Sequence, residues 1–376
     1  MTKKTIRVGL IGHQFMGVAH SNAFRNAGIW YDLPANIETV CVCAKDSEEN
    51  LRKFADKFGW REIETDWRKL VARDDIDLVS VASPGFLHRD MAIAAAENGK
   101  HVLCEKPLAN DLASAEAMWE AVKKNNVTSA CGFSYRFTPA TALAKELVDE
   151  GRLGEIYHVH ARYAQDWDEK GPMVWRFNKE LAGSGALGDL GSHSIDLSRF
   201  ITGGEIVSLV AQLKTFVKRR PISNEPNAPL GDVTVDDVAQ FICEFDNGAT
   251  GNFEATRFAG GRKNHNCIEI NGSKGSIYWD FEDQNYLLFC DKTESKQTQG
   301  FTRINATDDS HPYGGGPWPQ GHGIGYADTF VLEIANLITA LAEGRPYAPS
   351  FEDGLKCQRV LDAIDRSFAE RKWVDI

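Results

Sequence analysis

The sequence has no hydrophobic run that approaches the roughly 20 apolar residues needed to cross a membrane. Its N-terminus, Met-Thr-Lys-Lys, lacks the apolar core and the small-residue cleavage site of a secretory signal. No block of basic residues is present either, and the net charge of −11 disfavours a nucleic-acid partner. We therefore expect a cytoplasmic protein that binds neither membranes nor nucleic acids.

Paired cysteine motifs are missing as well. The eight cysteines are scattered, mostly in apolar runs, and Cys41 and Cys43 lack the two-residue gap of common zinc or redox pairs. These thiols are expected to be buried small hydrophobic groups in a reducing compartment. Internal repeats and low-complexity segments are absent, and 376 residues suffice for two domains.

The N-terminal segment contains a degenerate dinucleotide-binding fingerprint. Residues 5–11 have the composition of a buried strand, and Gly12-His-Gln-Phe-Met-Gly17 follows before a predicted helix. Gln14 stands where the fingerprint has its middle glycine, so the match is weakened. Backbone amides at Phe15 or Met16 can still meet phosphates at the helix N-terminus. We expect Gly12, Gln14, Phe15 and Met16 to contact a cofactor.

Strands and helices alternate after this segment. Such repeated units predict an α/β doubly wound parallel sheet, a Rossmann NAD(P)-binding domain over residues 1–133. The predicted strands cover 38–43, 77–82, 101–105 and 128–133, and the predicted helices cover 47–58, 90–98 and 112–125.

The residues after the second predicted strand bear on the choice between NAD and NADP. Ala44 stands where an acidic residue would bind the ribose hydroxyls, and Lys45 follows it. This arrangement favours NADP or mixed use, with Lys45 at the cofactor, unless Asp46 reaches the ribose instead.

Two segments follow later strands, where ligands bind to parallel sheets. The first, Ser83-Pro-Gly-Phe-Leu-His88, is expected to contact the cofactor. The second, Glu105-Lys-Pro107, is expected to hold Lys106 at the rim of the cofactor crevice, although a surface lysine is the ordinary alternative. The cofactor contacts expected from both segments are Ser83, Pro84, Leu87, His88 and Glu105.

The glycine-rich stretch Gly183–Asp196 carries an acid/base pattern. Asp189 and His193 have i, i+4 spacing, which brings side chains to one face of an α-helix. A carboxylate that orients an imidazole is a common catalytic arrangement, and a structural histidine is the alternative. A metal site is not expected, because only two ligand types converge where a catalytic zinc needs three protein ligands.

These motifs together resemble the Gfo/Idh/MocA oxidoreductase family over essentially the whole chain. The resemblance rests on the glycine turn, Ser83–His88, Glu105–Pro107 and Gly183–Asp196. Further stretches are similar to its levoglucosan dehydrogenase and inositol 2-dehydrogenase branch; they are Gln165-Asp-Trp167, Trp175-Arg-Phe177, His311–Gly314 and Gly323–Tyr326.

The resemblance implies NAD(P)-dependent oxidation of a ring hydroxyl on a sugar, anhydrosugar, glycoside or cyclitol. It makes Lys106 and His193 the catalytic residues and Asp189 the carboxylate partner of His193. Gln14 and Gly85 depart from the family pattern, which generally has Gly and Asn there. A redox-type glycosidase with retained NAD and a non-catalytic dinucleotide-bound sensor remain alternatives.

Residues 134–376 are expected to form an α+β domain with a large, open, mainly antiparallel sheet that binds substrate. Segments of alternating polarity follow a predicted helix at 138–149, and Asp246-Asn-Gly248 is a hairpin signal. The polar and aromatic loop 164–182 suits a polyol. The exposed sheet is expected to pair subunits into a homodimer or homotetramer. The substrate contacts expected here and nearby are Lys106, Tyr135, Gln165, Trp167, Trp175, Arg176, Asp189, His193 and Tyr326.

Overall fold

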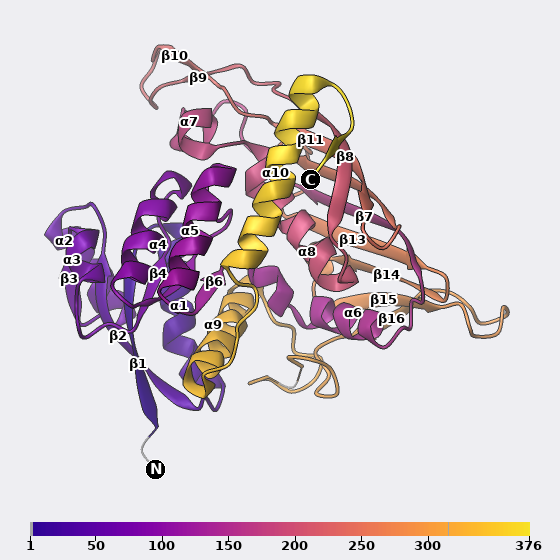
Figure 1. Ribbon diagram of the computed structural model, residues 1–376, viewed down its shortest axis with the longest axis horizontal. Helices are drawn as coiled ribbons and strands as arrows, with labels where there is room; N and C mark the ends of the chain where they lie inside the picture. Colours follow the sequence, from indigo (N-terminus) through magenta and orange to yellow (C-terminus); the bar gives the residue numbers. More distant parts are fainter. Residues whose placement is uncertain (1–2, 315) are drawn as a thin grey trace. The chain divides into compact units, whose positions relative to one another are not determined.

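The chain packs as two compact units in a computed structural model that describes residues 3–314 and 316–376 (Figure 1). A segment near the C-terminus belongs to the first unit, a return that the sequence pattern did not predict. The first unit comprises Met1–Phe137 and Gly325–Lys356, and the second comprises Thr138–Ile324 and Cys357–Ile376. The proposed division of function at residue 133 stays a prediction.

The first unit is built on a six-stranded parallel sheet with the order β3-β2-β1-β4-β5-β6. This order confirms the predicted doubly wound sheet, and β1 is buried along its second half. Strand β3 was missed because its three residues, Glu-Ile-Glu, contain no apolar run. The strands are β1 (Lys4–Ile11), β2 (Ala35–Cys43), β3 (Glu62–Glu64), β4 (Leu78–Val81), β5 (His101–Cys104) and β6 (Ser129–Cys131).

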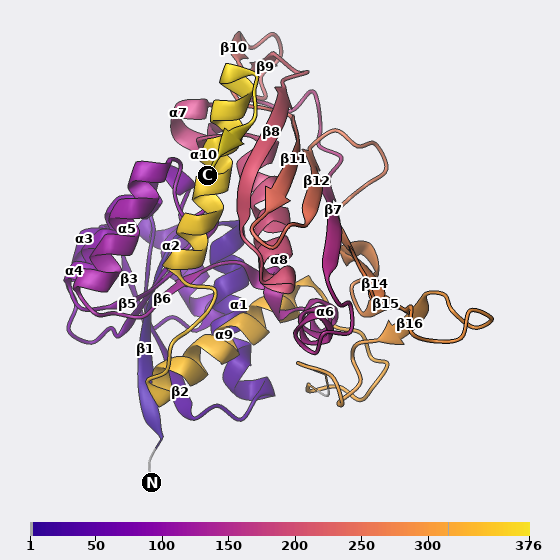
Figure 2. The ribbon, with the colours of Figure 1, turned by 45° about the vertical axis from the view of Figure 1, so that its right-hand side comes forward.

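Helices cover both faces of this sheet. Helices α4 and α5 lie side by side, and α9 packs against α1 (Figures 1 and 2). The predicted N-cap of α2 is confirmed, because Ser47 Oγ accepts a hydrogen bond from the Asn50 amide at 3.2 Å. The helices are α1 (Phe15–Trp30), α2 (Glu48–Phe58), α3 (Trp67–Val71), α4 (His88–Glu97), α5 (Leu112–Lys124) and α9 (Tyr326–Glu343), with 3₁₀ turns η1 (Gly85–Leu87) and η2 (Ser134–Phe137).

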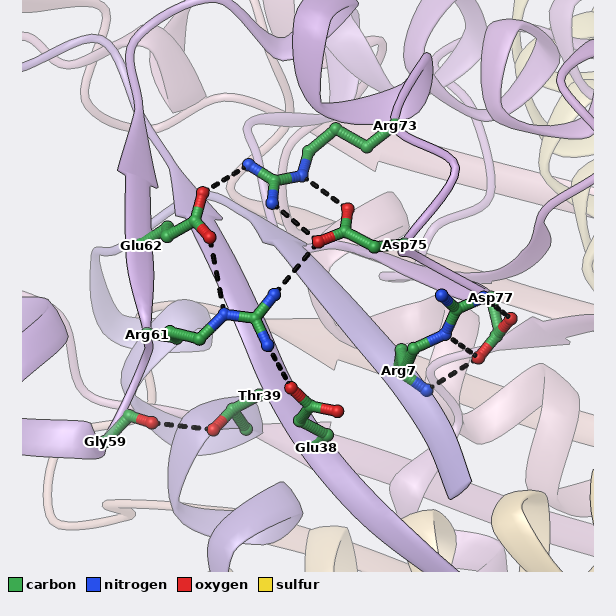
Figure 3. Close-up of polar contacts among 9 residues, drawn as sticks. All are labelled: Arg7, Glu38, Thr39, Gly59, Arg61, Glu62, Arg73, Asp75 and Asp77. Carbon is green, nitrogen blue, oxygen red and sulfur yellow. Dashed lines mark hydrogen bonds and ion pairs between the residues drawn. The ribbon is translucent and has the colours of Figure 1, made fainter. Parts of the chain in front are cut away.

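An ion-pair network ties β2, β3 and the segment before β4 together (Figure 3). Arg61 contacts Glu38, Glu62 and Asp75, and Arg73 bridges Glu62 and Asp75 at 2.7 and 2.8 Å. Hydrogen bonds from Arg73 lower the pKa values of both Glu62 and Asp75. These groups are partly exposed, so solvent screens the pairs and each contributes little to stability on its own.

His101 at the start of β5 is held in its neutral form. Its Nδ1 accepts a hydrogen bond from the Thr128 amide at 3.0 Å, which a protonated ring nitrogen cannot do. Burial lowers the pKa of His101 below its ordinary value of 6.5, with a further lowering by Lys4. The strand pair β5–β6 therefore depends on an unprotonated imidazole.

Stability should consequently fall as the pH drops below 6.5. The unfolded chain then binds a proton that folded His101 refuses, so the free energy of unfolding rises with pH between the folded pKa and 6.5. Each unit of pKa difference is worth about 1.4 kcal/mol. We expect His101→Asn, whose amide oxygen can replace Nδ1 as the acceptor, to reduce the stability lost between pH 7.5 and 5.5 in urea unfolding. The same change at exposed His322 should leave that loss unaltered; equal slopes in all three proteins would contradict the assignment.

The second unit contains a nine-stranded sheet with the order β16-β15-β14-β13-β7-β12-β11-β8-β17. Strands β7 and β12 run parallel, and the other neighbouring pairs among the described strands are antiparallel. The open, mainly antiparallel sheet is thus confirmed. The strands are β7 (Ile156–Ala164), β8 (Ile206–Lys214), β11 (Val238–Phe245), β12 (Thr250–Thr256), β13 (His265–Gly272), β14 (Gly275–Asp280), β15 (Tyr286–Asp291), β16 (Thr302–Asn305) and β17 (Val374–Asp375).

One face of this sheet is covered and the other is open. Helices α6 and α8 pack on the covered face (Figure 2). Along β11, buried and exposed residues alternate, and Tyr157, Ile242 and Trp373 are each about half exposed. The remaining elements of the unit are α6 (Pro139–Asp149), η3 (Trp175–Phe177), α7 (Lys179–Ala182), η4 (Leu187–Gly191), α8 (Ser192–Thr202), β9 (Arg219–Pro221), β10 (Leu230–Asp232), η5 (Phe281–Asp283) and α10 (Phe351–Glu370), whose first six residues belong to the first unit.

The stretch that carries Asp189 and His193 is only partly α-helical. Residues Leu187–Gly191 form a π-helical turn, and α8 begins at Ser192. The expectation that Asp189 and His193 lie on one continuous α-helix is therefore wrong. A π turn inserts an extra residue into the helical repeat, and such turns are frequent at functional sites.

The state of the cysteines and the length of the apolar helices bear on two earlier expectations. All eight cysteines are free thiols and six are buried, and burial raises the pKa of Cys41 to about 11. Within residues 3–314 and 316–376, no helix combines the length and the apolar character needed to span a membrane.

Candidate functional site

The glycine turn after β1 has a geometry that only glycine satisfies. Gly12 has φ +108°, and a Cβ on it would lie 2.4 Å from the Ala82 carbonyl oxygen. A Cβ on Gly17 would lie 2.3 Å from the Gly12 carbonyl oxygen. The turn is fixed by a 2.8 Å hydrogen bond from the Gly12 amide to the Cys43 carbonyl. The backbone therefore runs close to β4 and leads directly into α1.

The N-terminus of α1 fits a phosphate group. Gln14 is the N-cap, its side chain makes no capping hydrogen bond, and the first turn contains no acidic residue. The dipole and the amides of this turn, which include Phe15 and Met16, suit an anion. The Phe15 side chain is 66% exposed and stacks on Tyr326, with ring centroids 6.2 Å apart.

The carboxylate that follows β2 belongs to Asp46. It accepts a hydrogen bond from His13 Nε2 at 2.8 Å and another from Asn50 Nδ2 at 3.0 Å. Hydrogen bonds from Asn50, the Ser47 amide and His13 lower the pKa of Asp46, so it is ionised at neutral pH. Lys45 beside it is exposed. The end of β2 therefore presents a fixed negative charge next to the glycine turn.

The segment after β4 is anchored by His88, the first residue of α4. The ring is buried; Nε2 lies 3.0 Å from the Ser83 carbonyl and Nδ1 lies 3.2 Å from the Pro107 carbonyl. Burial lowers the pKa of His88. His88 thus links the two segments that were predicted to contact cofactor. Pro84 is the N-cap of η1, which ends at Leu87. The contacts of Ser83, Pro84, Leu87 and His88 with a cofactor stay predictions.

Gly85 departs from the expected asparagine, yet an amide group lies next to it. A Cβ on Gly85 would be 2.7 Å from Asn110 Oδ1. The space that a side chain at position 85 would occupy is therefore filled by Asn110, which the sequence analysis did not single out.

Glu105 and Lys106 sit at the end of a buried polar chain. Ser80 Oγ lies 2.7 Å from His20 Nδ1, and His20 Nε2 lies 2.8 Å from Glu105 Oε1. The other oxygen of Glu105 accepts a hydrogen bond from the Lys106 amide at 3.2 Å. Ser80, His20 and Glu105 are all at least 95% buried. This chain fixes the backbone from which the Lys106 side chain projects.

The two tyrosines predicted to contact substrate lie near each other in the first unit. The rings of Tyr135 and Tyr326 are 6.5 Å apart, and Phe330 packs edge-on against Tyr326 at 5.0 Å. Tyr326 is the first residue of α9, whose N-terminus is fixed by a 2.7 Å hydrogen bond from the Gly325 amide to Asp328 Oδ2.

The second unit joins two of its predicted substrate residues, Gln165 and Trp167, in one hydrogen-bonded array that also lies near His193. Trp167 Nε1 donates to Gln165 Oε1 at 2.6 Å, and Gln165 Nε2 donates to Asn264 Oδ1 at 2.7 Å. Tyr163 donates to the same Asn264 oxygen at 2.6 Å, and its ring lies 5.7 Å from the ring of His193. Tyr163 and Asn264 were not predicted to belong to the site. Tyr163 lies within β7 and Asn264 directly precedes β13, and neither residue is part of a recognisable motif.

Asp189 is held by a buried arginine that the sequence analysis also missed. Arg257 Nη2 donates to Asp189 Oδ2 at 3.1 Å, and its guanidinium carbon lies 4.3 Å from the centre of the Trp167 ring. The turn before Asp189 is fixed by Asp236, which accepts hydrogen bonds from the Gly185 and Leu187 amides. Burial raises the pKa of Asp236. The predicted pairing of Asp189 with His193 stays a prediction.

Trp175 and Arg176 form a separate pair in η3. The Arg176 guanidinium lies 4.5 Å from the centre of the Trp175 ring. Stacking of this kind presents a flat surface with hydrogen-bond donors at its edge, which suits a polyol.

The chain matches known sequences along most of its length. Residues 6–133 match the oxidoreductase family domain with the NAD-binding Rossmann fold, and residues 141–278 match the GFO/IDH/MocA C-terminal domain. Levoglucosan dehydrogenase of Pseudarthrobacter phenanthrenivorans is 39% identical over 99% of this chain and 98% of its own. The chain belongs to the Gfo/Idh/MocA oxidoreductase family. The resemblance read from the motifs is thereby confirmed, and the first unit of this Gfo/Idh/MocA protein contains the family's NAD-binding domain.

Solved structures agree with this assignment to the Gfo/Idh/MocA family. An oxidoreductase domain protein from Kribbella flavida has a TM-score of 0.95 and 52% identity over 100% of both chains. Levoglucosan dehydrogenase in complex with NADH and levoglucosan has a TM-score of 0.95 and 40% identity over 99% of both chains.

Proposed function

We propose that this protein is an NAD(P)-dependent dehydrogenase that oxidises a ring hydroxyl of a sugar, anhydrosugar, glycoside or cyclitol to a ketone. The observation that carries the proposal is the array in the second unit. Trp167, Gln165 and Asn264 are joined by hydrogen bonds. Arg257 links Asp189 to Trp167. Tyr163 links His193 to Asn264. Aromatic faces bind the C–H surface of a sugar ring, and amides and carboxylates bind its hydroxyls. The NAD-binding domain binds the dinucleotide, whose nicotinamide accepts the hydride from the polyol.

The proton chemistry is assigned to Lys106 and His193. The substrate hydroxyl must lose its proton as the carbon that bears it loses a hydride. One of the two side chains accepts this proton, and the other donates a hydrogen bond to the oxygen. The bound dinucleotide supplies the hydride acceptor. Lys106 is proposed as the base, with His193 as the alternative base, and Asp189 as the group that fixes the imidazole tautomer.

The experiment is a substrate panel followed by nicotinamide absorbance. Purified protein with NAD or NADP is given levoglucosan, glucose, inositols and glycosides. Cofactor reduction with one class of ring alcohol supports the proposal. Release of an aglycone without net reduction indicates the redox-glycosidase alternative. Cofactor binding with no turnover on any compound indicates a sensor and contradicts the proposal.

The fixed charge of Asp46 leads us to expect a preference for NAD over NADP. An ionised carboxylate at the end of β2 accepts hydrogen bonds from ribose hydroxyls and repels a 2′-phosphate. In Asp46→Asn, the ratio of kcat/KM for NAD to that for NADP should fall by about 10-fold or more, because a charge is lost and the shape is kept. Asp56→Asn, an exposed acid on α2, is the matched control and should leave the ratio unchanged. An unchanged ratio in Asp46→Asn would contradict this role.

Three broader expectations belong to the same proposal. The open face of the nine-stranded sheet, where half-exposed Ile242 and Trp373 share one surface, is proposed to pair subunits into a homodimer or homotetramer. The protein is proposed to work in the cytoplasm on a small-molecule substrate. Residues 1–133 are proposed to bind cofactor, and residues 134–376 to bind substrate and mediate assembly.

A further inference from the structure

The side chain of Arg257 touches two groups of the proposed substrate site at once. It follows β12 and is 1% exposed. Its Nη2 donates to Asp189 at 3.1 Å, and its guanidinium carbon lies over the Trp167 ring, 4.3 Å from the ring centre. The backbone repeats this connection, because the Trp167 amide donates to the Arg257 carbonyl at 2.8 Å.

The ion pair is asymmetric in its burial. The Asp189 side chain is 27% exposed, whereas that of Arg257 is 1% exposed. A buried cation destabilises a protein unless it has a charged or hydrogen-bonded partner. The buried guanidinium of Arg257 therefore anchors Asp189, while part of the Asp189 side chain stays exposed.

The contact of Arg257 with Trp167 orients the indole ring. The guanidinium packs against the indole ring, and the indole N–H is occupied by Gln165 at 2.6 Å. Two contacts, one to the ring face and one to its edge, define the ring plane. A lysine ammonium would keep the charge but not the planar stack.

We infer that Arg257 is a positioning residue that sets the Asp189 carboxylate and the Trp167 platform in one geometry. The inference rests on the proposed function and adds a residue to it. The positive charge of Arg257 holds the Asp189 carboxylate in place for the chemical step. Its planar guanidinium orients the Trp167 ring, which binds the sugar ring.

Two substitutions separate these roles. Arg257→Gln removes the charge, and we expect kcat to fall and KM for the carbohydrate to rise, each by about 10-fold, since small misplacements of reacting groups have effects of this size or larger. Arg257→Lys keeps the charge and should recover most of kcat while KM stays raised. KM for the dinucleotide should stay the same in both variants.

Arg220 provides a matched control. It is also 1% exposed and stacks on an aromatic ring, Phe177, at 4.1 Å, but the side-chain hydrogen bonds shown for it go to the Asp168 and Gly171 carbonyls. Arg220→Gln should lower the melting temperature as much as Arg257→Gln does, with kcat within about twofold of the wild type. Equal losses of kcat in the two glutamine variants, or no difference between Arg257→Gln and Arg257→Lys, would overturn the inference.

A readout independent of turnover separates this inference from the proposed function. Relative to a crystal structure of the wild type, the structure of Arg257→Lys should show a displaced Trp167 ring. If Arg257→Gln folds, its structure should show both the Trp167 ring and the Asp189 carboxylate displaced. Unmoved Trp167 and Asp189 would overturn the positioning role. A wild type that oxidises no carbohydrate would instead overturn the proposed function, and the structures would still decide the role of Arg257.

Discussion

Replacing Lys106 by methionine should lower kcat for carbohydrate oxidation by ~10²-fold or more, because an amine that takes or holds the hydroxyl proton has no substitute in a thioether. The backbone of residue 106 is fixed by the Ser80–His20–Glu105 chain, so the substitution leaves the main chain in place. The dissociation constant for NADH, measured by fluorescence titration, should change by less than about twofold. The loss therefore should appear in the chemical step and not in cofactor binding.

Lys124→Met is the control for this variant. Lys124 is an exposed lysine at the end of α5, and its replacement should leave both kcat and the NADH affinity unchanged. If Lys106→Met retained the wild-type rate, the assignment of Lys106 as a catalytic residue would be wrong, and His193 would have to be examined as the only proton-handling group.

Replacing Gly12 by alanine should weaken NADH binding strongly. Position 12 has φ +108°, a backbone conformation that alanine rarely adopts, and the added Cβ would lie 2.4 Å from the Ala82 carbonyl oxygen. The turn must therefore move away from β4, and the N-terminus of α1 moves with it. We expect the NADH dissociation constant to rise by ~10²-fold or more, since a pyrophosphate is bound by backbone amides whose positions this turn sets.

Gly28→Ala in α1, the helix that follows this turn, provides the comparison. A Cβ there meets nothing within 4 Å, so the substitution should leave NADH binding unchanged and raise helix stability by up to about 1 kcal/mol. If Gly12→Ala does not fold, thermal unfolding will show it, and Gly17→Ala then offers a second test, because its Cβ would meet the Gly12 carbonyl oxygen at 2.3 Å. Normal NADH affinity in a folded Gly12→Ala protein would contradict the role of the turn.

The parallel sheet of the first unit could be predicted from sequence because its signals are local. A buried apolar strand, a glycine turn and an N-capping Ser47 each act within a few residues, and repeating such strand–helix units gives a parallel sheet. The elements that were missed are short or polar. β3 is Glu-Ile-Glu, and α3 has five residues after an Asp66 cap, so neither gives a periodic apolar pattern.

The site in the second unit was only half predictable. Trp167, Asp189 and His193 stand out in the sequence because their residue types and neighbours are unusual. Arg257 and Asn264 do not, since an arginine after a strand and an asparagine in a turn are ordinary. Their importance comes from tertiary contacts across about 70 to 100 residues of sequence, which local patterns do not encode.

The π turn at Leu187–Gly191 also could not be predicted from local sequence patterns. Its sequence, Leu-Gly-Asp-Leu-Gly, was interpreted as α-helical from the spacing of its polar residues. The turn is instead set by Asp236, some 50 residues later, which binds the Gly185 and Leu187 amides. A distant carboxylate thus determines the backbone from which Asp189 projects, and spacing rules cannot anticipate it.

The most direct test of the account follows deuterium from a carbohydrate to the nicotinamide. Levoglucosan, glucose and inositol, each deuterated at every ring carbon, are incubated with the protein and NAD, and the NADH formed is analysed by mass spectrometry. The account predicts NADH that carries one deuterium from one class of ring alcohol, together with a ketone lacking that deuterium. NADH without deuterium, or no NADH from any ring alcohol although NAD binds, would contradict it.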